Sequence, residues 1–269
     1  MVEIFDDIRK IYRFRAPCAD LTDVVEFFSE SSAEETVKHI AGERFTVKLF
    51  PSWTPTFWFN LGCPYQLVAG DKAYRISAVN DVMILRDTIT ERKNLPDDHI
   101  FTVKFFPGGL DMIFGISLGS LPDRVIDLKT ILPVKLIQTV KLASSFEERV
   151  ALLQDYFIAG MEKRKRKDHH LKFVKDTIET FESSGLRFNN SELAAKLFTT
   201  SKTINRYFHS VVGTGPKQYF SAVRTRATLT AYIADRKNFM PDEFGYYDMS
   251  HFYKDVLKFT GQRLTAFPG

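Results

Sequence analysis

Near the carboxyl end of the chain stands the run Gly245-Tyr246-Tyr247-Asp248-Met249-Ser250-His251-Phe252, which predicts a tight turn followed by a short helix. Gly245 can adopt the backbone angles that such a turn requires. The carboxylate of Asp248 can accept hydrogen bonds from the free N–H groups of a helix that begins at Met249. Gly261 is a typical glycine end for that helix.

The two faces of this helix differ in chemistry. Phe252, Val256 and Phe259 recur at helical spacing, so we expect them to pack inward. The side chains left facing outward are Met249, Ser250, Tyr253 and Lys254. This pattern is typical of a helix that contacts another molecule, and it is also compatible with an ordinary amphipathic helix that has a conventional cap.

A further pair of helices is predicted upstream. Asn189 and Glu192 form a capping box in front of a helix expected over residues 191–198. Thr200 can cap the next helix, expected over residues 201–211. Two short helices joined by a tight turn form a helix-turn-helix.

The second of these helices has a polar, basic outer face. Ile204, Phe208 and Val211 turn inward, which leaves outward a set of polar side chains: Lys202, Asn205 and Arg206. Arg and Lys can bond bidentately to guanine and Asn to adenine, and a helix is narrow enough to enter the major groove. Backbone amides at residues 200–202 and the ammonium of Lys217 are expected to meet phosphates.

Taken together, these residues resemble the DNA-binding domain of bacterial AraC/XylS-type transcription regulators. The first unit is similar through Leu193-Ala194, the run from Thr200 to Phe208, and Gly213-Thr214-Gly215-Pro216. The second is similar through Gly-Tyr-x-Asp-x-Ser-His-Phe-x-Lys, which ends in Thr260-Gly261. The resemblance covers residues 186–267 and implies two helix-turn-helix units on double-stranded DNA. The residues expected to contact DNA are Thr200, Ser201, Lys202, Asn205, Arg206, Lys217, Met249, Ser250, Tyr253 and Lys254.

The second unit departs from the family pattern in its first helix, the scanning helix. Met240 and Pro241 stand where the family has an Ile-Ala pair inside that helix. A proline inside a helix removes a hydrogen bond and clashes with the preceding turn, which costs roughly 3 kcal/mol. We therefore expect the scanning helix to be shortened or replaced by a loop, and the recognition helix after it to be formed.

The composition of the 269-residue chain indicates a folded protein of two ordinary domains. Hydrophobic residues make up 44% of it, and no apolar run approaches the roughly twenty residues of a membrane span. The acidic start, residues 1–7, differs from a basic secretory signal. Cys18 and Cys63 match no metal spacing, and we expect buried thiols in a reducing cytoplasm.

The net charge of +4 is unevenly distributed along the chain. Residues 1–160 carry 18 Lys and Arg against 22 Asp and Glu, which gives −4. Residues 161–269 carry 19 against 11, which gives +8. A basic region joined to an acidic one favours a nucleic-acid-binding domain attached to a domain with another task.

Residues 1–143 predict a mainly-β domain. Short apolar or alternating runs are separated by turn residues every ten or so positions, which favours a sandwich or small barrel. These runs cover residues 45–50, 56–61, 65–68, 73–76, 82–85 and 100–106. The family resemblance implies a cupin-like sensor barrel here. The expected fold class is therefore α+β, with a β-rich domain followed by an all-α domain.

This domain has no recognisable catalytic or metal-binding pattern. Metal-dependent cupins need clustered His ligands, whereas only His39 and His99 occur before residue 160 and they lie far apart. No paired carboxylates, nucleophile elbow or phosphate-binding glycine loop is recognisable. We therefore expect a protein that is not an enzyme and that holds no metal or cofactor.

The aromatic residues of the β-rich domain leave two interpretations open. They can simply fill the core, or they can line a pocket where Arg75 or Arg86 meets an anionic ligand. The residues concerned are Trp53, Phe57, Trp58, Phe59, Tyr65, Phe105 and Phe106. The effector and its binding residues are left unassigned.

Residues 144–170 predict a connecting helix and a basic linker. Ser145 and Glu148 can cap the helix, and its apolar stripe is Phe146, Val150, Leu153 and Phe157. The helix can pack on the β-rich domain or pair with its copy in a homodimer. The basic run over residues 163–170 is either a solvated linker or a contact with phosphates. Residues 171–269 then form the DNA-binding domain.

These features predict a cytoplasmic, sequence-specific DNA-binding transcription regulator controlled by a ligand or partner at its N-terminal domain. The implied partners are double-stranded DNA, a small-molecule effector, RNA polymerase and a second copy of the chain, with no membrane. The alternative is a ligand-sensing or interaction protein that has lost sequence-specific DNA binding, which Pro241 favours. A barrel enzyme is a third hypothesis, and it would need a bound metal or cofactor.

Overall fold

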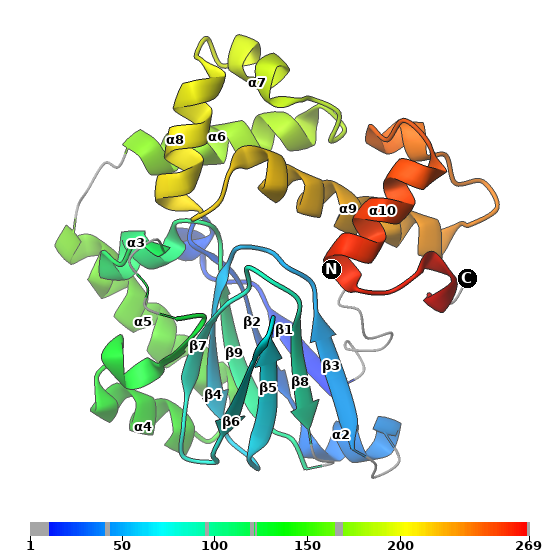
Figure 1. The fold of residues 1–269 in the computed structure, drawn as a ribbon. Helices are drawn as coiled ribbons and strands as arrows, with labels where there is room; N and C mark the ends of the chain where they lie inside the picture. Colours follow the sequence, from blue (N-terminus) through cyan, green and yellow to red (C-terminus); the bar gives the residue numbers. More distant parts are fainter. Residues whose placement is uncertain are drawn as a thin grey trace.

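The structure is a computed structural model that describes residues 11–40, 44–94, 97–118, 121, 123–164 and 169–267. Two antiparallel sheets form the first part, and a set of helices lies across one end of them (Figure 1). The fold class is α+β, as predicted. Residues 165–168, which belong to the predicted basic linker, lie outside the described residues.

The strands pair into a six-stranded and a four-stranded sheet within the described residues. The first sheet has the order β1-β2-β9-β4-β7-β10, and the second has the order β3-β8-β5-β6. The strands of the first are β1 (Tyr12–Arg15), β2 (Val25–Ser31), β4 (Pro55–Asn60), β7 (Val82–Leu85), β9 (Ile100–Phe105) and β10 (Val125–Asp127). Those of the second are β3 (Phe45–Leu49), β5 (Tyr65–Ala69), β6 (Lys72–Ile76) and β8 (Thr90–Asn94).

All six runs predicted as strands are strands, and β1, β2, β8 and β10 are additional. Strand β8 has the sequence Thr-Glu-Arg-Lys-Asn, which contains no apolar residue. It nevertheless buries Thr90, Arg92 and Asn94 on one face. The positive charge of the buried Arg92 is balanced by the carboxylate of Asp98, which lies 2.8 Å from the Arg92 guanidinium. A strand with a polar buried face has no hydrophobic alternation, so the sequence pattern gave no signal for it.

The helices of the first part cover one face of the six-stranded sheet. They are α3 (Gly109–Phe114), α4 (Val134–Leu142) and α5 (Phe146–Arg164); α2 (Ala33–Ile40) and the 3₁₀ turns η1 (Ala19–Leu21) and η3 (Leu128–Thr130) complete this part. Alternation sends Phe57 and Phe105 toward α5, where their ring centroids lie 6.4 and 5.6 Å from that of Phe157. The connecting helix therefore packs on the β-rich part, the first of its two predicted arrangements. The domain limits at residues 143 and 170 stay a prediction.

The helical part consists of α6 (His169–Ser183), α7 (Asn190–Lys196), α8 (Ser201–Val211), α9 (Pro216–Ala234) and α10 (Met249–Thr260), with 3₁₀ turns η4 (Pro241–Phe244) and η5 (Leu264–Ala266). Phe181, Phe208 and Phe220 pack together beneath α6, α8 and α9. A separate cluster around Leu229, Phe252 and Val256 holds α10 against α9. The long helix α9 thus joins the pair α7 and α8 to the segment of η4 and α10, as Figure 1 shows.

One predicted boundary is wrong. The helix expected over residues 191–198 is α7, which ends at Lys196. Leu197 lies just after the helix and is half-buried, and Phe198 has a φ of 50°. The chain leaves the helix at Phe198 because it must turn sharply to begin α8.

Candidate nucleic-acid interface

Helix α8, the predicted first recognition helix, is held by its own N-cap, by the capped helix α7 before it and by an apolar face. Asn189 and Glu192 form the predicted capping box of α7, and the Thr200 hydroxyl accepts a hydrogen bond from the Thr203 N–H at 3.1 Å. Ile204 and Phe208 are fully buried. Burial of these two side chains fixes the orientation of the helix about its axis, so its polar face points outward.

The outer face of α8 carries the residues predicted to read bases. Lys202, Asn205 and Arg206 are all exposed. The Arg206 guanidinium lies 4.9 Å from the centroid of the Tyr207 ring, a cation–π contact that restrains the side chain without neutralising it. Among the described residues no carboxylate pairs with Lys202 or Arg206, so both positive charges are available to a partner.

Ser201 and Lys217, two more of the predicted DNA contacts, differ in exposure. The hydroxyl of Ser201 donates a hydrogen bond to the Asn190 carbonyl at 3.3 Å, and the residue is half-buried. Lys217 is exposed in the first turn of α9. Ser201 therefore helps to join α7 to α8, and its backbone amide is the group left to meet a phosphate.

The second recognition helix, α10, begins and ends as predicted. An Asp248 carboxylate oxygen accepts a hydrogen bond from the His251 N–H at 2.7 Å, and Gly261 ends the helix with a φ of 67°. Phe252, Val256 and Phe259 are buried. On the outer face Met249, Ser250 and Lys254 are exposed, whereas Tyr253 is half-buried against the cluster around Leu229.

The scanning helix of the second unit is reduced, as Pro241 predicted. The segment before the Gly245 turn is the four-residue 3₁₀ helix η4, which buries none of its residues. Phe244 packs partly on the cluster around Leu229, and polar contacts hold the turn that follows. The Tyr246 hydroxyl lies 2.9 Å from the hydroxyl of Thr225 on α9, and Arg224 donates to the Leu186 carbonyl at 2.8 Å. Burial lowers the pKa of Arg224 from its ordinary value.

The C-terminal ends of both recognition helices touch the β-rich part. Phe259 of α10 packs on Phe50 and Trp53, with ring centroids 6.0 and 6.4 Å apart. At the end of α8, the Ser117 hydroxyl donates to the Ser210 carbonyl at 3.4 Å. Both helices consequently run from the outer side of the helical part toward the sheets (Figure 1).

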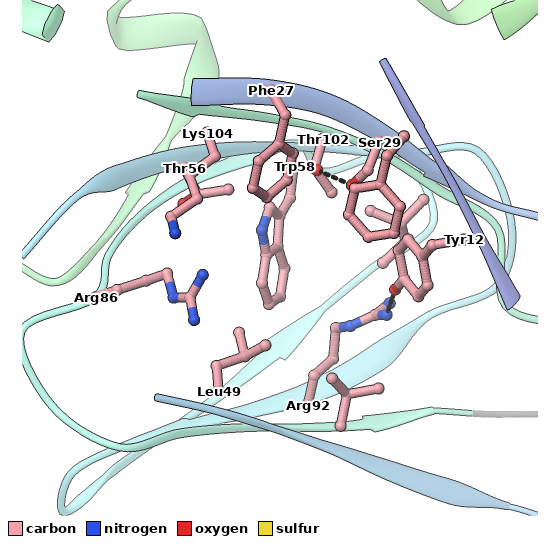
Figure 2. Close-up of a pocket in the computed structure, with 13 residues that line it drawn as sticks. Tyr12, Phe27, Ser29, Leu49, Thr56, Trp58, Arg86, Arg92, Thr102 and Lys104 are labelled. Atoms are coloured by element: carbon pink, nitrogen blue, oxygen red, sulfur yellow. Dashed lines mark hydrogen bonds between the residues drawn. The ribbon is translucent and has the colours of Figure 1, made fainter. Parts of the chain in front are cut away.

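A cavity of about 50 Å³ lies between the two sheets and is lined by aromatic, aliphatic and cationic side chains. In Figure 2, Trp58 stands between Arg86 on one side and Tyr12 with Arg92 on the other. Arg86 donates to the Phe50 carbonyl at 3.0 Å, and the Lys104 ammonium lies 2.9 Å from a Glu26 oxygen.

The predicted aromatic set is divided among several places. Trp58 lines this cavity with Arg86, whereas Phe57, Phe59 and Phe105 belong to the core beneath α5. Tyr65 and Arg75 lie at a different hollow. Trp53 contacts α10 and Phe106 is partly exposed. Most members of the set therefore fill the core, and Trp58 lines the cavity; binding of an anionic ligand there stays a prediction. The cavity residues on β2 and β8 escaped sequence analysis because those strands were not predicted.

Other predicted chemistry can be placed in the described part of the chain. No group of three or more His, Cys, Asp or Glu side chains is positioned there to hold a metal ion. Cys18 and Cys63 are half-buried free thiols, rather than fully buried ones. No helix among the described residues has the length and apolar character needed to cross a membrane.

No protein-family model and no curated protein matches the chain. Among solved structures, ToxT from Vibrio cholerae matches at 12% identity and a TM-score of 0.49, over 97% of this chain and 100% of that one. ToxT from strain O395 bound to (E)-4-(8-methylnaphthalen-1-yl)but-3-enoic acid matches at 11% and 0.46, over 94% and 97%. The AraC-like transcriptional activator CuxR matches at 13% and 0.29, over 84% and 88%. These likenesses are too distant to carry an argument about function.

Proposed function

We propose that this protein is a sequence-specific DNA-binding transcription regulator in which α8 and α10 enter successive segments of one major groove. The observation that carries the proposal is the repeated arrangement on α9. Each unit presents a capped recognition helix with a buried apolar face and an exposed polar face. A helix of this kind fits the major groove, where it can reach base edges.

The proposed contacts follow from exposure and chemistry. Arg206 and Lys202 read guanine, Asn205 reads adenine, and the amides at the start of α8 meet a phosphate together with Lys217. In the second unit Met249, Ser250 and Lys254 contact bases or backbone. Tyr253 makes a smaller contact, because part of its side chain packs inward.

Control by a ligand is supported by the position of Arg86 between the cavity and α10. Its guanidinium lines the cavity and donates to the Phe50 carbonyl, while its own carbonyl accepts hydrogen bonds from Ser52 and Trp53 at 2.8 and 2.9 Å. Phe50 and Trp53 then pack on Phe259. A small organic anion that draws Arg86 toward the cavity would shift this segment and hence the end of α10.

The second candidate is an interaction or sensing protein without sequence-specific DNA binding. The observation in its favour is η4, since a single 3₁₀ turn with no fully buried residue gives α10 less support than α7, with Leu193 and Ala194 buried, gives α8. The two candidates differ in how the protein discriminates among DNA sequences, and both permit weak salt-dependent binding.

Selection of bound fragments from genomic DNA, followed by affinity measurement at fixed salt, distinguishes them. We expect strong enrichment of a few fragments and their loss on Arg206→Ala. The matched control is Lys135→Ala, which removes one exposed positive charge from α4, far from the recognition helices. Uniform weak retention of all fragments would support the second candidate, and equal binding by the Arg206→Ala variant would contradict the proposed role of α8.

A further inference from the structure

The turn between α7 and α8 exposes an aromatic ring almost completely. Phe198 has 98% of its surface accessible to solvent, which is the largest value among the exposed apolar residues described. Aromatic side chains normally bury about 150–250 Å² in a core or an interface. The ring contributes no packing to the fold, so its presence has no explanation inside the chain.

The backbone at Phe198 makes this choice of residue more unusual. The Thr199 N–H donates to the Ala194 carbonyl at 2.9 Å, and the Phe198 N–H donates to the Ala195 carbonyl at 3.3 Å. These two bonds form a Schellman motif, whose left-handed residue is usually glycine. Phe198 occupies that position with a φ of 50°, where a bulky side chain is strained. Local structure therefore favours glycine.

The second unit also presents an exposed aromatic residue just before the cap of its recognition helix. Tyr247 is 92% exposed and immediately precedes Asp248, the cap of α10. Phe198 stands two residues before Thr200, the cap of α8. Two units with different scanning segments thus carry an aromatic ring at the entrance of the recognition helix. Both entrances lie on the side of the helical part that faces away from the sheets (Figure 1).

We infer that Phe198 makes an apolar contact with double-stranded DNA beside α8, and that Tyr247 makes the equivalent contact beside α10. This inference rests on the proposed function. Charge favours DNA as the occupant, because Phe198 is followed by the exposed Lys202 and preceded by the exposed Lys196, with no acidic residue between them. The apolar surface that DNA offers here is a thymine methyl group or a deoxyribose face.

Three substitutions at this position separate the role of the ring from that of the backbone. Phe198→Gly removes the ring and relieves the strain, Phe198→Ala removes the ring alone, and Phe198→Trp keeps an aromatic surface. Affinity is measured on a duplex that the wild-type protein selects from a random library, by fluorescence anisotropy at fixed salt. The same duplex with uracil in place of thymine distinguishes a methyl contact from a sugar contact.

We expect Phe198→Gly and Phe198→Ala to bind about tenfold more weakly, which corresponds to about 1.4 kcal/mol. Phe198→Trp should bind as the wild type does. The melting temperature of Phe198→Gly should rise by roughly 2 °C, because the left-handed turn is relieved. A loss of affinity together with a gain in stability would identify a residue retained for contact.

Several outcomes would overturn the inference. The first is affinity of Phe198→Gly within twofold of the wild type. The second is a lower melting temperature for that variant, since the ring would then support the fold. The third is a wild-type dimer that Phe198→Gly dissociates without a change in DNA affinity, since the ring would then meet a second copy. If the wild-type protein selects no DNA, the proposed function fails as well.

Discussion

The two predicted helix-turn-helix units support their second helices, α8 and α10, through different contacts. In the first, α7 and α6 support α8 through buried side chains such as Leu193 and Phe181. In the second, η4 has no fully buried residue and packs through the half-buried Phe244, and α10 is also held by α9 and by Phe50 and Trp53 of the β-rich part. Trp53 has a φ of 48°, so this contact includes a strained backbone position. The first unit therefore has a full supporting helix of its own and the second does not, while both also contact the β-rich part at the ends of α8 and α10.

The largest expected effect concerns the core of the first unit. Phe208 is fully buried beneath α6 and α9. Phe208→Ala should lower the free energy of unfolding by about 3–5 kcal/mol, because it removes a buried ring and leaves a cavity. Urea denaturation followed by circular dichroism measures this change. A loss below about 1 kcal/mol would mean that α8 is not supported from within its own unit.

The coupling of the second unit is tested at Phe50. Phe50→Ala should cost about 3 kcal/mol, the lower end for a buried phenylalanine, since the two parts can close over the gap. The amides of α10 should exchange with solvent faster in this variant, while those of α8 remain protected. Val79→Ala, on an exposed residue of the same domain, is the control. An equal increase in amide exchange in α8 and α10 would show that both helices depend on Phe50 to the same extent.

A smaller difference is expected between the two faces that we propose to contact DNA. Arg206→Ala should weaken binding to a selected site by about 1–3 kcal/mol and relax the base preference at one position. Lys254→Ala should cost less and act equally on all sequences, since an ammonium on the less firmly supported helix serves mainly phosphates. Competition binding against single-base variants of the site measures both. If Lys254→Ala had the larger and more sequence-dependent effect, α10 would be the helix that discriminates among bases.

The smallest effects concern the helix caps. Thr200→Ala and Asp248→Ala each remove one hydrogen bond to the free N–H groups of a recognition helix. Each should lower the free energy of unfolding by about 1 kcal/mol. Matched urea titrations of the two variants test whether the units share this feature. A cost for only one of them would mean that the other helix begins without its cap.

The features of the fold that could be predicted from the sequence are those whose cause lies within a few neighbouring residues. The caps at Asn189, Thr200 and Asp248 and the effect of Pro241 were predicted because each acts over a few residues. The strand with buried Arg92 was missed, since its partner Asp98 compensates a face that sequence patterns treat as exposed. The contact of Phe50 with Phe259 joins residues far apart in sequence, and periodicity carries no information about such pairs.

The same holds for the candidate site, where the sequence predicted some exposed residues and missed another. Exposure of Lys202, Asn205 and Arg206 follows from the spacing of Ile204 and Phe208. The exposure of Phe198 does not, because an apolar residue after a helix is expected to continue its buried stripe. Only the left-handed turn directs that ring into solvent.

Hydroxyl-radical footprinting of the wild-type protein on a selected duplex tests most directly whether α8 and α10 act together on one major groove. We expect two protected segments about one helical turn apart, with the segment assigned to α8 lost in Arg206→Ala. Protection spread evenly over the duplex, or none at all, would contradict this expectation.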